Sequence, residues 1–203
     1  MHGGTIRVDK ATGLIDAARQ CPSPNQDERP DDAEPELLVL HGISLPPGRF
    51  GGPEIESLFT NALDWNAHDY FKQIRGLEVS AHLLIRRDGE LVQFVPFTRR
   101  AWHAGESVFR GRSRCNDFSI GIELEGEDNT PYTDAQYEVL IPLLAELIET
   151  YEGLSAREIA AHSDLSAGRK TDPGPAFDWL RLYDGLGARW DDPDEPVPGT
   201  LAT

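Results

Sequence analysis

The sequence predicts a single domain of mixed α and β structure, and three stretches of the chain carry this prediction. The run 37–40 is apolar on both alternating faces, which is typical of a central strand covered on both sides. Segment 79–95 holds two apolar runs around an Asp-Gly dipeptide, which indicates a β-hairpin. Segment 134–151 has apolar residues at helical spacing. The chain of 203 residues is 39% hydrophobic and is therefore long enough for one sizeable core.

Shorter signals place the elements of the first half. Residues 1–35 are rich in proline and acidic residues, and they form either an ordered wrapper or a loose arm beside the domain. Residues 45–53 are rich in Gly and Pro, which predicts a loop. A short helix is expected from Pro53 to Leu63, with the proline in its first turn.

The segment 118–125 alternates strictly between apolar residues and small or acidic ones, which predicts a strand with two different faces. The apolar face consists of Phe118, Ile120, Ile122 and Leu124, and the other face of Ser119, Gly121, Glu123 and Glu125. Small residues together with a carboxylate are typical of the floor of an open cleft.

In the second half, Thr133 is a suitable cap for the helix 134–151, and Pro142 is expected to kink or break that helix. A short strand is predicted over 158–162, with His162 on the face opposite its apolar neighbours, followed by a last helix over 176–183. We expect the main domain to cover residues 36–185. Residues 186–203 form an acidic, proline-rich tail with an irregular or disordered pattern.

The charge balance argues against two classes of partner. The chain has 19 basic and 35 acidic residues and a net charge of −16, which repels phosphate backbones and anionic membrane surfaces. We therefore expect no nucleic acid and no membrane partner. The first twenty residues lack a secretory-signal pattern, which predicts a cytoplasmic protein, and Cys21 and Cys115 are expected to be free thiols.

Three residues form a candidate metal site. His41 ends the most apolar run, His162 ends the predicted short strand, and Asp172 lies in the Gly- and Pro-rich loop that follows. Two histidines and a carboxylate are a common ligand set of catalytic zinc, which keeps a fourth position for water. Their spacing is not a helical metal motif, and the alternative interpretation is packed or hydrogen-bonded histidines at strand ends.

Two further residues are candidates for catalysis. Glu123 lies on the small-residue face of its strand, where a carboxylate can take a proton from a metal-activated water. Lys170, two residues before Asp172, can stabilise a developing oxyanion. The alternatives are a solvated surface glutamate and an ordinary loop lysine.

Five segments together are more specific than any of these residues alone. They read LHGISLPPG (40–48), SAH (80–82), RRAWHAG (99–105), CNDFSIGIELEG (115–126) and KTDPGP (170–175). In order and spacing they resemble the AmpD family of cytoplasmic zinc amidases, which are N-acetylmuramoyl-L-alanine amidases specialised for 1,6-anhydro-muropeptides in cell-wall recycling. The resemblance covers residues 13–182.

The resemblance implies an α+β fold with a central mixed β-sheet flanked by helices, as in amidases and peptidoglycan recognition proteins. It also implies a zinc cofactor and a small anhydro-muramyl peptide as substrate, bound by a protein that we assume to be a monomer. The implied roles are zinc ligands for His41, His162 and Asp172, general base for Glu123, oxyanion stabilisation for Lys170, and substrate binding for Trp102 and Arg114.

Other positions also bear on the site that the resemblance implies. Gly42 stands where some members have Asn, so a polar contact with the substrate is in doubt. His82 and His103 match family positions, and we assign them to support of the site. The basic patch of Arg110, Arg112 and Arg114 either receives the carboxylates of the stem peptide or is a solvated rim.

Two other functions remain as alternatives. A peptidoglycan-binding or sensor module of the same fold would lack catalysis, and its sign would be a missing ligand, whereas all three candidate ligands are present. An exported amidase that acts on the intact cell wall would need an export signal.

Overall fold

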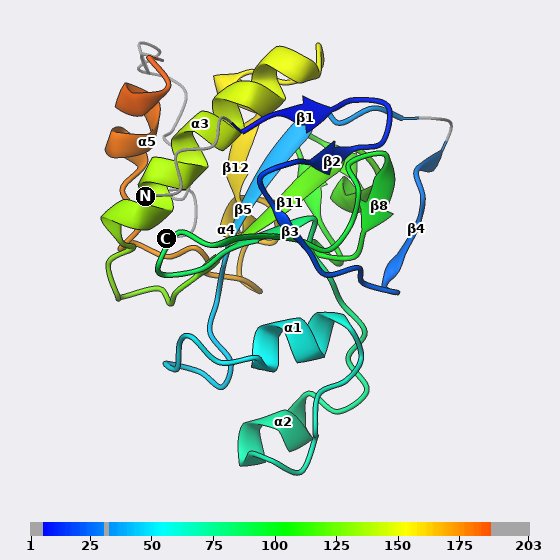
Figure 1. The fold of residues 1–203 in the computed structure, drawn as a ribbon, viewed down its shortest axis with the longest axis vertical. Helices are drawn as coiled ribbons and strands as arrows, with labels where there is room; N and C mark the ends of the chain where they lie inside the picture. The colour runs from blue at the N-terminus through cyan, green and yellow to red at the C-terminus, as the bar shows by residue number, and fades with distance from the viewer. Residues whose placement is uncertain (1–5, 31–32, 188–203) are drawn as a thin grey trace.

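The computed structural model describes residues 6–30 and 33–187, and a six-stranded mixed sheet lies at its centre (Figure 1). The strand order is β12-β5-β11-β6-β7-β3. The first four strands run parallel, β7 is antiparallel to β6, and β3 is parallel to β7. The predicted mixed sheet flanked by helices is confirmed.

The strands are β1 (Val8–Asp9), β2 (Leu14–Ile15), β3 (Arg19–Gln20), β4 (Gln26–Glu28), β5 (Leu37–Ile43), β6 (Leu83–Ile85), β7 (Leu91–Gln93), β8 (Arg99–Ala101), β9 (Val108–Phe109), β10 (Arg112–Ser113), β11 (Ser119–Glu125) and β12 (Ile159–Ala161). The helices are α1 (Glu54–Phe59), α2 (Asp69–Gln73), α3 (Asp134–Thr150), α4 (His162–Leu165) and α5 (Trp179–Gly185), with 3-10 turns η2 (Cys115–Asp117) and η3 (Ala156–Glu158).

Helices α3 and α5 cover one face of the sheet (Figure 1). Helices α1 and α2 belong to a second hydrophobic cluster, on the side of the opposite face (Figure 1). On β5, Leu38 and Leu40 pack into the cluster under α3, and Leu37 and Val39 pack into a separate cluster. The alternation of side chains along a strand produces this division. His41 follows the odd-numbered residues and therefore lies on the face away from α3.

The strand β11 differs from its prediction in two respects. Phe118 lies outside it, because η2 ends there with a ψ of 11°, and its ring packs with Leu37 rather than with Ile120. The face of small residues is also not an open floor. Ser119 and Gly121 are buried, and a Cβ at Gly121 would lie 2.4 Å from the His103 ring, so this ring covers that part of the strand.

Helix α3 begins where it was predicted. Thr133 and Gln136 form a reciprocal capping box, and the buried Gln136 Nε2 also donates to the carbonyls of Ile85 and Glu125. Of the two outcomes expected at Pro142, a kink or a break, the break is wrong, since the helix continues through this residue. Pro142 is on the exposed side, and the buried leucines around it hold the helix on the sheet despite the missing hydrogen bond.

Two helix boundaries differ from their predictions, whereas the hairpin agrees with its prediction. Helix α1 is shorter than predicted because Asn61 takes a left-handed φ of 59°. Helix α5 starts later than predicted, where the Asp178 side chain accepts from the Arg181 backbone N–H. The hairpin β6–β7 formed as predicted, with Gly89 at a φ of 86°.

The N-terminal residues 6–30 form four short strands, of which β3 joins the edge of the main sheet. This is the wrapper alternative rather than the loose arm. The predicted tail lies outside the described residues from position 188 onward. Both thiols, Cys21 and Cys115, are free as expected. In the described part of the chain, no helix has the length and apolar character to cross a bilayer.

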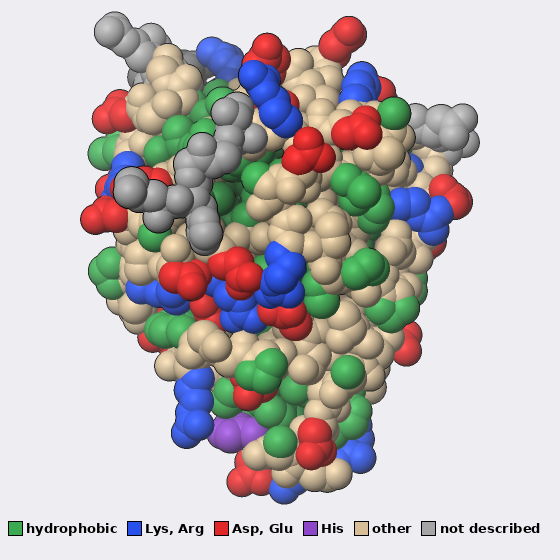
Figure 2. Space-filling model, viewed as in Figure 1, with side chains coloured by type: hydrophobic (Ala, Val, Ile, Leu, Met, Phe, Trp, Pro, Cys, Tyr) green, Lys and Arg blue, Asp and Glu red, His purple; other side chains and the backbone are tan. Residues whose placement is uncertain are grey.

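Figure 2 shows one face of the molecule, where acidic and basic side chains lie close together among scattered hydrophobic ones. Ion pairs also connect separate elements of the fold. Arg19, for example, binds Glu56 and Glu90, which connects the N-terminal segment to α1 and to the hairpin turn. Despite the net negative charge of the chain, this face is therefore not uniformly acidic (Figure 2).

Candidate metal centre and active site

The candidate residues meet at the carboxyl ends of the parallel strands, where open α/β sheets usually bind ligands. His41 is on β5, and Glu123 on β11 is its direct neighbour in the parallel register. His162 follows β12 directly, on the other side of β5. Sheet order thus brings together residues that are far apart in the sequence.

His162 is not part of a strand, contrary to its prediction. It is the first residue of α4, which begins there because the Asp164 carboxylate accepts from the Ala161 backbone N–H at 2.9 Å. This turn directs the His162 ring towards His41.

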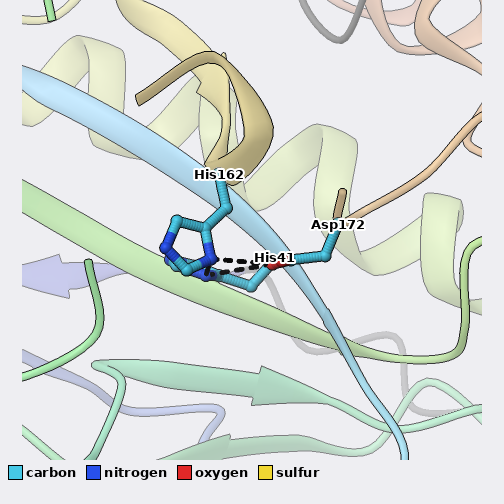
Figure 3. A group of neighbouring side chains, drawn as sticks. All are labelled: His41, His162 and Asp172. Carbon is cyan, nitrogen blue, oxygen red and sulfur yellow. Dashed lines mark hydrogen bonds and ion pairs between the residues drawn. The ribbon is translucent and has the colours of Figure 1, made fainter. Parts of the chain in front are cut away.

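His41, His162 and Asp172 point toward one another (Figure 3). Nδ1 of His41 lies 2.9 Å from Nδ1 of His162, and Oδ2 of Asp172 lies 3.4 Å and 3.0 Å from these two nitrogens. Tetrahedral zinc with ligand bonds of about 2.0–2.1 Å requires ligand atoms about 3.3 Å apart. The donor types and their spacing therefore fit a zinc ion.

Asp172 is held by its surroundings. Its carbonyl accepts from the Ser163 N–H, and the Tyr132 hydroxyl donates to the carbonyl of Pro173 at 2.9 Å. A Cβ at Gly42 would lie 2.4 Å from that hydroxyl. Glycine at position 42 therefore leaves room for Tyr132 to fix the segment that carries Asp172. Tyr132 was not singled out from the sequence, because a tyrosine before a helix cap carries no chemical signal.

The charges of the site favour a base beside a neutral His41. Burial, and then the neighbouring His162, lower the pKa of His41 to about 4, so its ring is neutral at pH 7. Burial and then Asp172 raise the pKa of Glu123 well above its usual value, while Lys170 acts in the opposite direction. The Oε2 atom of Glu123 is buried without a hydrogen-bond partner. An unpaired carboxylate oxygen of this kind is suited to accept a proton.

A cavity of about 520 Å³ connects these groups to solvent. Its polar end contains the three candidate ligands, Glu123 and Lys170. Its other wall is apolar and comes from α1, α2 and the segment after them, with Leu58, Phe59, Tyr70, Ile74, Leu77 and Val79. No pattern in the sequence indicated this wall, because its residues also look like ordinary core positions.

Trp102 and Arg114 are not among the residues that line this cavity. The Trp102 backbone N–H donates to the hydroxyl of Ser80, a residue that lines the cavity, and Arg114 is exposed and paired with Asp117. In the basic patch, Arg112 pairs with Glu36. Substrate contact by Trp102 and Arg114 stays a prediction.

Comparisons with known proteins agree with this geometry. Residues 31–175 match the family model Amidase_2, described as N-acetylmuramoyl-L-alanine amidase. The chain is 61% identical over 170 residues to the 1,6-anhydro-N-acetylmuramyl-L-alanine amidase AmpD of Enterobacter cloacae, covering 84% of this chain and 90% of the relative. It is 48% identical over 178 residues to the protein of that name from Haemophilus influenzae, covering 88% and 97%.

Solved structures give the same result. A crystal structure of a selenomethionine AmpD derivative superposes with a TM-score of 0.85 at 56% identity, covering 88% of this chain and 98% of that one. AmiD from Escherichia coli, in complex with the substrate anhydro-N-acetylmuramic acid-L-Ala-D-gamma-Glu-L-Lys, superposes with a TM-score of 0.56 at 27% identity, covering 93% and 68%.

Proposed function

The chain belongs to the Amidase_2 family of N-acetylmuramoyl-L-alanine amidases, and from that premise we propose that it hydrolyses the amide bond between 1,6-anhydro-N-acetylmuramic acid and L-alanine in muropeptides. This reaction belongs to peptidoglycan recycling. The observation that carries the proposal is the meeting of His41, His162 and Asp172 beside the unpaired carboxylate of Glu123 in one cavity.

We propose zinc as the cofactor, held by Nδ1 of His41, Nδ1 of His162 and Oδ2 of Asp172. When bound, zinc lowers the pKa of a water molecule toward about 7 and polarises a carbonyl. The neutral state of His41 leaves a lone pair for the metal at neutral pH.

Glu123 acts as the general base. Burial raises the pKa of Glu123, which makes the carboxylate a stronger base, so Oε2 can take a proton from the attacking water and return it to the departing L-alanine amine. Because the carboxylate is buried, bulk water does not compete for that proton.

Lys170 supplies positive charge at the same end of the cavity, where it stabilises the oxyanion that forms as the amide carbonyl is attacked. Lys170 lowers the pKa of Glu123, which supports a position of the ammonium close to that carboxylate. The ammonium thus favours both the ionised base and the transition state.

We propose a small muropeptide as substrate and the cytoplasm as the location, as in the family that the sequence resembles. The cavity volume suits a sugar and a short peptide. The AmpD relative is named for its action on 1,6-anhydro-N-acetylmuramyl-L-alanine, and the AmiD structure is a complex with an anhydro-muramyl tripeptide. The net charge of −16 disfavours nucleic acid and anionic membrane partners.

The test is turnover of an anhydro-muramyl tripeptide compared with polymeric cell wall, with the products identified by mass spectrometry. We expect anhydro-muramic acid and free peptide from the small substrate and little release from the wall. Binding without cleavage would support a silent recognition module instead, and faster release from the wall would support an exported wall amidase.

A further inference from the structure

We propose that the segment His103-Ala104 orients both histidines of the metal site, and that His103 is a positioning residue for His41. This inference rests on the proposed zinc site. It concerns the two ring nitrogens that point away from the metal position, Nε2 of His41 and Nε2 of His162.

Each of these nitrogens meets an atom of the same segment. Nε2 of His41 lies 2.9 Å from Nδ1 of His103, and Nε2 of His162 lies 3.4 Å from the carbonyl oxygen of Ala104. A histidine that binds metal through Nδ1 carries its proton on Nε2, and that proton needs an acceptor. Two consecutive residues provide both acceptors.

The carbonyl of Ala104 can only accept, so it fixes the tautomer of His162 directly. The His103 ring can accept or donate, so its own tautomer must be set by another group. Its Nε2 lies 3.0 Å from the Ser119 hydroxyl. When His103 donates to Ser119, its Nδ1 accepts from His41, and Nδ1 of His41 is left without a proton for the metal.

Neighbouring residues hold this segment in place. The Asn116 side-chain oxygen accepts from the backbone N–H groups of His103 and Ala104, and Arg169 donates to the Ala104 carbonyl. The close approach of the His103 ring to β11 is possible because position 121 is glycine. The absence of a side chain at position 121 leaves the space that the His103 ring occupies.

The experiment measures the zinc Kd of the full-length chain by competition with a chelator. His103→Leu keeps a similar volume but removes the acceptor, and we expect the Kd to rise about 10–100-fold. His103→Asn returns an acceptor oxygen near the position of Nδ1, and we expect it to recover most of the affinity. Ser119→Ala should weaken zinc binding by a smaller factor than His103→Leu.

Ser107→Ala is the matched control. Ser107 bonds to the backbone of Gly105 and Cys115 in the same region but not to His41 or His162. It should lower the unfolding temperature of the zinc-free protein and leave the zinc Kd unchanged. If His103 only stabilised the fold, its variants would likewise lower the unfolding temperature and leave the zinc Kd unchanged.

A second readout uses the zinc-loaded protein. Proton–nitrogen NMR of the histidine rings should show a protected Nε2 proton on His41, which exchanges faster in His103→Leu and in Ser119→Ala. If folded His103→Leu binds zinc with wild-type Kd, or if Ser119→Ala leaves that proton equally protected, the inference is wrong. Wild-type protein that binds no zinc would instead overturn the proposed function.

Discussion

Glu123 is the side chain on which we expect turnover to depend most directly. Its buried and unpaired Oε2 has no other evident role, and removal of a positioned base costs about 10²–10⁴-fold in rate. We predict that Glu123→Gln lowers kcat by that factor while zinc content stays at the wild-type level. Parallel kinetics and metal analysis check this, with Glu149→Gln on the exposed side of α3 as the control. A kcat within threefold of wild type would mean that another group is the base.

The pH profile reports the same group. Since burial raises the pKa of Glu123, the acid limb of kcat/KM should lie above the usual range of a glutamate, and activity is lost as pH falls through that pKa. Lys170 lowers this pKa, so Lys170→Met should move the limb to higher pH, whereas Lys170→Arg should leave it nearly in place. If the acid limb stays at the same pH in Lys170→Met, Lys170 does not influence the pKa of Glu123.

The candidate ligands could be identified by residue type and by the resemblance, but not by spacing. His41 and His162 are 121 positions apart, and their 2.9 Å approach depends on the pairing of β12 with β5. Such pairing is a property of the whole sheet. The roles of Tyr132 and the Ser119 hydroxyl were hidden for the same reason, because each depends on a partner that is distant in the chain.

Elements with strong local signals were predicted well. The apolar β5, the Asp-Gly hairpin and the capped start of α3 all formed, since each is encoded within a few residues. The errors occurred where packing outweighed a local rule. Helix α3 continues through Pro142, and Phe118 leaves the alternating pattern of β11 because a 3-10 turn precedes it.

Gln136 connects helix α3 to the ends of two strands. Its amide donates to the carbonyls of Ile85 and Glu125, and its buried position means that these carbonyls have no access to water when the side chain is replaced. We predict that Gln136→Met lowers the free energy of unfolding by about 2–4 kcal/mol. Urea denaturation measures this, with the exposed Glu138→Gln as control. A loss below about 0.5 kcal/mol would show that other groups satisfy these carbonyls.

Glu56 joins α1 to the N-terminal segment and the hairpin. Hydrogen bonds from Arg19, opposed by burial and reinforced by Arg86, lower its pKa to about 2. A lowered pKa stabilises the fold above the unfolded value of 4.5, and this contribution disappears as pH falls toward 2.

Because Glu56 is partly exposed, we predict that Glu56→Gln costs about 1 kcal/mol at pH 7 and much less at pH 2.5. Glu54→Gln, on the same helix and outside this network, is the control. Denaturation at both pH values checks the prediction, and an equal loss at both would show that the effect is not ionic.

The charge of the whole molecule should affect encounter with substrate. A chain of net charge −16 repels the carboxylates of the proposed muropeptide, and salt screens that repulsion. We predict that kcat/KM rises about two- to fivefold between 10 and 150 mM salt. A substrate with amidated carboxylates should show no such rise. A fall in kcat/KM with salt would point instead to local attraction by basic residues.

We propose that one metal ion, held by His41, His162 and Asp172, works with Glu123 in this cavity. Stepwise addition of zinc to the metal-free protein, with turnover measured at each step, tests it most directly. We expect no turnover without metal and a linear rise in turnover that ends at one zinc per chain. Full turnover in the metal-free protein, or a zinc-saturated protein without turnover, would contradict it.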